Sequence, residues 1–171
     1  TLNSVKQVLE SSAIAEHGAP TAVGITDQRE TIVLWDRETL GSARMAIVWQ
    51  DRRTAGFCDQ LKADGHEDRV RELTGLRLDP YFSATKLSWI KKQEPNVWAG
   101  VESGRTAIGT IDSYLIARMT RGVTHVTDAS NASRTLLFDI STGEWSQELC
   151  DLFGVPIEAL PEVVPSYGQV G

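Results

Sequence analysis

The chain has 171 residues, of which 41% are apolar and 23% charged, with 14 glycines and 6 prolines. This composition excludes the disordered and fibrous classes, and the length suits one domain or a large part of one. Seventeen Lys and Arg against 23 Asp and Glu give a net charge of −6, which argues against nucleic acid or an anionic membrane as a partner.

In the first third of the chain, the sequence predicts one helix and three strands. Leu2, Val5, Val8 and Leu9 fall on one face of a predicted helix over residues 2–9, with Ser4 and Gln7 as a capping box. The third strand is the longest apolar run of the chain and is far shorter than the roughly 18 residues of a membrane span. The strands are expected at Ala22 to Ile25, Thr31 to Trp35 and Met45 to Trp49.

The rest of the chain is predicted to be mainly helical, with glycine or proline at each helix end. The last helix is followed by a linker from Leu160 to Gly171, and Thr135 to Ile140 is expected to be a strand. Strands followed by helices with short connections indicate the α/β class. The helices are expected at residues 54–63, 66–73, 83–92 (ending before Pro95), 110–120 and 146–153. The inward stripe of the fourth is expected to be Ile111, Leu115, Ile116 and Met119.

Searches for familiar catalytic motifs exclude several site types. The sequence has no P-loop, no G-x-G-x-x-G after a strand, no H-E-x-x-H, no EF-hand loop and no G-x-S-x-G. His17, His66 and His125 have no partner at useful spacing, and a lone histidine is more often structural than catalytic. Cys58 and Cys150 form no C-x-x-C pair and are predicted to be buried thiols, typical of a protein in the cytoplasm.

The first polar block, Thr26 to Thr31, separates two predicted strands. A half-buried strand would alternate apolar and polar residues, and this run does not. Arg29 and Glu30 would place a fork of donors beside a two-oxygen acceptor. A small polyhydroxy ligand needs both, because each hydroxyl donates one proton and also accepts. A solvated turn with a surface ion pair would explain the same residues.

The second block, Asp79 to Lys86, mixes aromatic and polar residues. Tyr81 could cover the C–H surface of a ligand with its ring and bond the ligand through its hydroxyl. The alternative is a helix start with Ser83 as N-cap and Tyr81 packed in the core. Trp49 is either a core residue or an apolar wall of a pocket.

Taken together, these blocks resemble the glycerol kinases of the large sugar and polyol kinase family, which has an actin-like, ribonuclease-H-like fold. The resemblance extends from about Ala22 to the end of the chain. The Arg-Glu-Thr and Asp-Pro-Tyr-Phe-Ser sequences favour the glycerol members over the xylulose or gluconate members. The resembling runs are residues 24–31, 46–54, 74–76, 79–86, 109–113 and 127–135.

The resemblance implies ATP-dependent phosphorylation of glycerol, with ATP and Mg²⁺ bound largely by parts of the protein outside this chain. Arg29, Glu30 and Tyr81 align with the residues that bind the glycerol hydroxyls, and Trp49 with the indole that packs against the carbon chain. We expect the full-length protein to be a homo-oligomer.

This sequence also departs from the family pattern. It has no Asp-x-Gly-Thr phosphate loop and no counterpart of the second, nucleotide-binding domain that carries the catalytic base. Asp27 stands where Asn is usual, which could alter the pairing of Arg29, and Tyr114 stands where Trp is usual. We assign the base to none of the aspartates, which are Asp27, Asp79, Asp112 and Asp128 in the resembling runs.

We therefore expect residues 1–171 to be an incomplete N-terminal substrate-binding domain, without catalytic residues or a metal site and inactive alone. Three alternatives stay open: a non-catalytic polyol-binding or regulatory module, a related carbohydrate kinase with another polyol substrate, and a scaffold domain that binds no small ligand.

Overall fold

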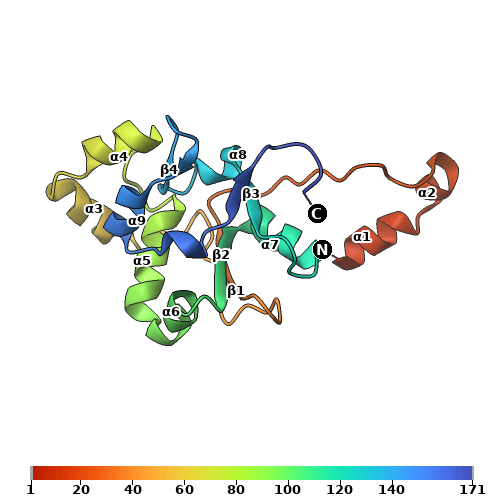
Figure 1. Ribbon diagram of the computed structural model, residues 1–171, viewed down its shortest axis with the longest axis horizontal. Coiled ribbons are helices and arrows are strands. Elements are labelled where there is room, and N and C mark those ends of the chain that lie inside the picture. The colour runs from red at the N-terminus through yellow and green to blue at the C-terminus, as the bar shows by residue number, and fades with distance from the viewer. Residues whose placement is uncertain (1, 171) are drawn as a thin grey trace.

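The centre of the fold is a pair of antiparallel strands in a computed structural model that describes residues 2–170 (Figure 1). Strand β1 (Ile32–Asp36) pairs with β2 (Thr106–Thr110), so that Ile32 lies opposite Thr110. The strand predicted at Thr31 to Trp35 is confirmed, one residue later. Its unbroken apolar run reflects burial on both faces, because a strand with one wet face would alternate.

Successive residues of β1 enter two different cores. Ile32 and Leu34 belong to a large cluster that also includes Leu87 and Ile90 of α5 (Ser83–Gln93). Val33 and Trp35 belong to a smaller cluster beside α7 (Ile111–Met119). The strand is thus fixed from both sides just after the polar block that precedes it.

Four of the helices agree with the sequence prediction. Helices α3, α4, α5 and α9 are confirmed, and Gly75 and Gly154 end two of them in the left-handed conformation, at φ 71° and 67°. The bounds of three of these helices are α3 (Ala55–Ala63), α4 (Glu67–Thr74) and α9 (Gln147–Phe153). The later part of the chain also contains α8 (Ala129–Ala132), η1 (Ile157–Ala159), β3 (Val126–Asp128), β4 (Phe138–Asp139), β5 (Glu144–Trp145) and β6 (Glu162–Val164).

The sequence reasoning missed helix α6 and strand β2. Pro95 does not merely end α5: it is the first residue of α6 (Pro95–Glu102), where its missing N–H leaves no hydrogen bond unmade. Gly109 made residues 100–109 look like a loop, but it is a strand residue that needs to be small. A Cβ there would lie 2.6 Å from Ser113 Cβ and 2.9 Å from Trp35 Cη2.

Two predicted strands are wrong. Ala22 to Ile25 forms no strand, and Val23 is 71% exposed. Of Met45 to Trp49, only Ile47 makes a bridge, to Ile32. A strand is stable only when a neighbour satisfies its backbone groups, and within the described residues neither segment finds a continuous partner.

The first two helices stand apart from the body of the molecule (Figure 1). Helix α1 (Leu2–Leu9) was predicted correctly, but its apolar stripe is not buried: Val5, Val8 and Leu9 are 47%, 60% and 49% exposed. The predicted capping box is also wrong, since the helix already begins at Leu2 and Ser4 lies inside it. Helix α2 (Ser12–His17) follows it.

Three later predictions need correction. Helix α7 itself is confirmed, and Ile111 of its predicted stripe packs against the smaller cluster, but Leu115 and Ile116 are only half-buried and Met119 is 49% exposed. The fully buried residues of this helix are Asp112, Ser113 and Ala117. Only Phe138–Asp139 of the strand predicted at 135–140 is extended in a ladder. The supposed linker contains β6, which pairs in parallel with β3 and so belongs to the fold.

Among residues 2–170, none of the helices combines the length and the apolar character that a membrane span requires.

Candidate functional site

The polar block before β1 forms a turn that buries one residue and exposes its neighbour. Thr31 N donates to Gln28 O over 2.9 Å, which closes the turn. Glu30 is only 4% exposed, whereas Arg29 is exposed. The fixed start of β1 therefore carries a buried carboxylate beside a solvent-facing guanidinium.

The Glu30 carboxylate has one partner among the described residues. Arg134 Nε donates to Glu30 Oε1 over 2.8 Å, and the side chains are 26% and 5% exposed. No donor from residues 2–170 reaches the second oxygen, Oε2. A buried carboxylate needs a partner to offset its desolvation, and this arrangement leaves one oxygen able to accept a hydrogen bond from a ligand.

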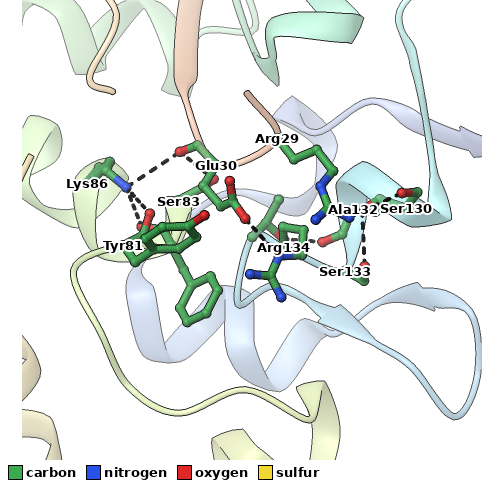
Figure 2. Close-up of polar contacts among 11 residues, drawn as sticks. Arg29, Glu30, Tyr81, Ser83, Lys86, Ser130, Ala132, Ser133 and Arg134 are labelled. Carbon is green, nitrogen blue, oxygen red and sulfur yellow. Dashed lines mark hydrogen bonds and ion pairs between the residues drawn. The ribbon is translucent and has the colours of Figure 1, made fainter. Parts of the chain in front are cut away.

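Tyr81 lies beside this ion pair. Figure 2 shows the carboxylate of Glu30 between the Tyr81 ring and Arg134, whose Cζ is 5.8 Å from the Tyr81 centroid and 4.9 Å from that of Phe82. The ring of Trp49 meets the Tyr81 ring edge-on, with centroids 5.5 Å apart. Both aromatic side chains are half-buried. Within the part of the chain that the structure describes, the Tyr81 hydroxyl has no hydrogen-bond partner.

Arg29 reaches toward the same region from the other side. Its Nη1 lies 3.4 Å from both the carbonyl and the hydroxyl oxygen of Ser130 in α8, and Figure 2 shows Arg29 pointing toward Ser130. These contacts are long, so the guanidinium retains donors for a ligand. The four predicted site residues are thus neighbours: Glu30 and Tyr81 meet at Arg134, Trp49 packs on Tyr81, and Arg29 adjoins Glu30.

Beneath the site, a buried lysine joins the segment that carries Glu30 to the segment that carries Tyr81. Lys86 of α5 is fully buried, and its ammonium donates to the carbonyls of Tyr81 and Phe82 and lies 3.5 Å from the carbonyl of Glu30. Burial lowers the pKa of Lys86 to about 8. Ser83 also donates to the Glu30 carbonyl, over 3.3 Å. The N-cap of α5 is Phe82, so the prediction of Ser83 as N-cap is wrong.

Comparison with known proteins decides the family. The sequence matches the FGGY family of carbohydrate kinases, N-terminal domain, over residues 1–171. The chain belongs to the FGGY family. It is 57% identical over 150 residues to a glycerol kinase of Methylobacterium nodulans, covering 88% of this chain and 30% of the relative, and 53% identical over 171 residues to one of Alcanivorax borkumensis, covering 100% and 34%. The chain thus spans about a third of the length of these curated relatives.

Solved structures agree with this assignment. The crystal structure of Plasmodium falciparum glycerol kinase with ADP is 33% identical, with a TM-score of 0.87 over 99% of this chain and 33% of that one. A xylulose kinase from Brucella ovis is 26% identical, with a TM-score of 0.81 over 96% and 32%. The predicted α/β, ribonuclease-H-like class of an actin-like kinase domain is confirmed.

In this FGGY domain, the aspartates of the resembling runs have structural partners. Asp27 accepts from the backbone N of Asp112 at the start of α7 over 2.7 Å, rather than pairing with Arg29. Burial, and then the charge of Asp112, raises the pKa of Asp27 to about 6. Asp112 itself accepts from the hydroxyls of Thr110 and Thr127. The last two complete the set: Asp79 accepts from Tyr81 N and Asp128 from Asn131 N.

The other side chains considered from the sequence also have structural roles. His125 Nε2 lies 2.8 Å from the carbonyl of Ile108 and Nδ1 lies 3.1 Å from Arg37 Nη1, so Nε2–H donates and Nδ1 accepts. Burial lowers the pKa of His125 to about 4, which keeps it neutral. Cys58 and Cys150 are buried thiols, as predicted.

Sequence reasoning missed Arg134, Lys86 and Ser130 as parts of this region. Arg134 and Ser130 lie within a run quoted for the family resemblance, but nothing in the local pattern singles them out. They reach the turn at residues 28–31 across 104 and 101 residues of chain.

Proposed function

We propose that the natural protein carrying this chain is a glycerol kinase, which transfers the γ-phosphoryl group of ATP to a terminal hydroxyl of glycerol. This chain supplies the polyol site: Arg29, Glu30 and Tyr81 bind the hydroxyls, and Trp49 packs against the carbon chain. The FGGY family membership and the names of the glycerol kinase relatives support the proposal.

The observation that carries this proposal is the pair of unpartnered polar atoms at the site. Within residues 2–170, neither Glu30 Oε2 nor the Tyr81 hydroxyl has a hydrogen-bond partner. The carboxylate can only accept, the guanidinium of Arg29 can only donate, and the phenol can do both. A triol matches this set because each hydroxyl donates and accepts.

The aromatic wall supplies the other half of substrate recognition. The rings of Trp49 and Tyr81, which meet edge-on, offer apolar surface to the C–H groups of a short carbon chain. Phosphoryl transfer depends mainly on positioning and charge stabilisation. A polyol site that positions its substrate by hydrogen bonds therefore contributes directly to the reaction.

The nucleotide and metal are expected to bind mainly outside this chain. No group of three or more His, Cys, Asp or Glu residues in the described part is arranged to hold a metal ion, and the sequence has no phosphate loop. These residues do not fit a Mg²⁺ site, so we assign no step to the metal here. No catalytic base is assigned, and the cytoplasm and a homo-oligomer stay predictions.

A substrate panel on the natural protein tests the proposal. With ATP, we expect phosphorylation of glycerol at a higher kcat/KM than of xylulose or gluconate, and Glu30→Gln and Arg29→Ala should each raise the KM for glycerol. Preference for xylulose or gluconate would identify a different carbohydrate kinase. Glycerol binding without any turnover would favour the non-catalytic module, and no effect of glycerol on stability would favour a scaffold.

The 171-residue chain alone gives a second test. We expect no formation of glycerol 3-phosphate from this chain and only weak glycerol binding, because this domain forms one side of the site. Robust product formation by the isolated chain, or submillimolar binding in calorimetry, would contradict this expectation.

A further inference from the structure

Arg134 joins the two segments that carry the proposed glycerol ligands. It follows helix α8 and precedes the buried Thr135. Its Nε bonds the carboxylate of Glu30, and its guanidinium lies over the rings of Phe82 and Tyr81, at 4.9 Å and 5.8 Å (Figure 2). One side chain thus contacts both the buried acid and the aromatic part of the site.

The geometry of the ion pair is monodentate. Arg134 is the side chain among residues 2–170 that bonds the Glu30 carboxylate, and it does so through Oε1 alone. A fork-to-fork pair would occupy both oxygens. Here the guanidinium lies over the Phe82 ring while Nε engages Oε1, and Oε2 has no partner among the described residues.

We propose that Arg134 is a positioning residue that holds the Glu30 carboxylate in place, with Oε2 turned to the substrate, and thereby sets the preference for a hydroxyl donor at that point. This inference rests on the proposed glycerol site and adds to it. Arg134 acts through Glu30 and does not itself contact glycerol. Without the guanidinium, a carboxylate that is only 5% exposed would lose its partner and its fixed orientation.

Steady-state kinetics of the natural protein provide the main test, using Arg134→Met, Arg134→Lys, Glu30→Gln and the double variant Glu30→Gln/Arg134→Met. Arg134→Met should raise the KM for glycerol roughly 30-fold or more, and should change the KM for ATP less than about twofold. Arg134→Lys should recover only part of this loss, because an ammonium lacks the planar fork and the ring stacking.

The double variant separates action through Glu30 from an independent effect. If Arg134 works by orienting Glu30, the double variant has the same KM for glycerol as Glu30→Gln alone. Fully additive effects would overturn the inference, since Arg134 would then act independently of the carboxylate.

Deoxy analogues of glycerol test the specificity claim directly. The wild-type protein should discriminate most strongly against whichever diol, propane-1,2-diol or propane-1,3-diol, lacks the hydroxyl that donates to Glu30. That diol leaves the Glu30 oxygen without a donor. Arg134→Met should reduce this discrimination severalfold. Unchanged discrimination against both diols would contradict the proposed role.

Arg69→Met is a matched control, since Arg69 also bonds carboxylates, those of Glu72 and Glu148, but on the surface. It should leave the kinetic constants unchanged. Thermal melting reports folding, and if Arg134→Met does not fold, Arg134→Lys decides by the same comparison. A lower melting temperature with an unchanged KM would make Arg134 merely structural.

The two proposals fail in different ways. If the wild-type protein does not phosphorylate glycerol, or Glu30→Gln has no effect on glycerol, the proposed function fails and the inference fails with it. If the wild type and Glu30→Gln behave as expected and the Arg134 variants match the wild type, only the inference is overturned.

Discussion

Gly109 gives a sharp test of how closely β2 and α7 approach β1. In Gly109→Ala, the new Cβ would lie 2.6 Å from Ser113 Cβ and 2.9 Å from Trp35 Cη2, well inside ordinary contact distances. Trp35 cannot move away easily, because it is 2% exposed and packs against Tyr114 and His125, with centroids 5.3 and 5.2 Å away. The clash must therefore be relieved by shifts of the backbone.

Overpacking of this kind usually destabilises a protein by about 1–3 kcal/mol. Because both neighbours of Gly109 are buried, we expect about 2 kcal/mol, which lowers the melting temperature by roughly 4–8 °C in a domain of this size. Urea unfolding monitored by tryptophan fluorescence and thermal melting by circular dichroism measure the change.

A second glycine serves as the matched control. Gly56 lies in α3, has no positive φ, and a Cβ there meets nothing within 4 Å. Gly56→Ala should therefore stabilise the chain by about 0.5 kcal/mol, because alanine loses less entropy on folding into a helix. A Gly109→Ala variant as stable as the wild type, beside a normal Gly56→Ala, would refute the packing argument.

Three further predictions concern buried polar groups. Asp27→Asn keeps the acceptor for Asp112 N and removes a carboxylate whose pKa is raised to about 6. The wild type loses stability as the pH rises from 3.8 through 6. The variant should therefore have a higher melting temperature than the wild type at pH 7.5, and this difference should shrink by pH 5. Asp112→Ala should lower the free energy of unfolding by about 2–4 kcal/mol in urea titrations, because the hydroxyls of Thr110 and Thr127 lose their acceptor. Lys86→Met should raise the KM of the natural protein for glycerol more than that for ATP, since the carbonyls of the two site segments lose their shared donor; an unchanged glycerol KM would contradict this.

Local patterns predicted the elements whose signals are local. The apolar run of β1 and the glycines after α4 and α9 each act within a few residues, and they gave correct elements. The failures need distant partners. Residues 22–25 have the composition of a strand but no neighbour to pair with in the described chain, whereas β6 pairs with β3 from 36 residues away.

The candidate site divides in the same way. Composition drew attention to the blocks that contain Arg29, Glu30 and Tyr81, but only the family resemblance assigned these residues and Trp49 to a site. The structure brings the four side chains together. The residues that hold these side chains in place could not be found from local sequence patterns. Lys86 reaches the Glu30 carbonyl across 56 residues, and no period or spacing in the sequence records such a contact.

The resulting site has a rigid half and an adaptable half. Glu30 is held at both ends, with its carbonyl near Ser83 and Lys86 and its carboxylate bonded to Arg134. Arg29, by contrast, is exposed and makes only 3.4 Å contacts. In the proposed glycerol site, the acceptor is therefore ordered before the ligand arrives, and only the donor on Arg29 must lose side-chain entropy on binding. A preformed acceptor rejects a ligand that lacks the matching hydroxyl, whereas a mobile guanidinium can follow small changes in ligand shape, so selectivity is expected to come from the Glu30 side of the site.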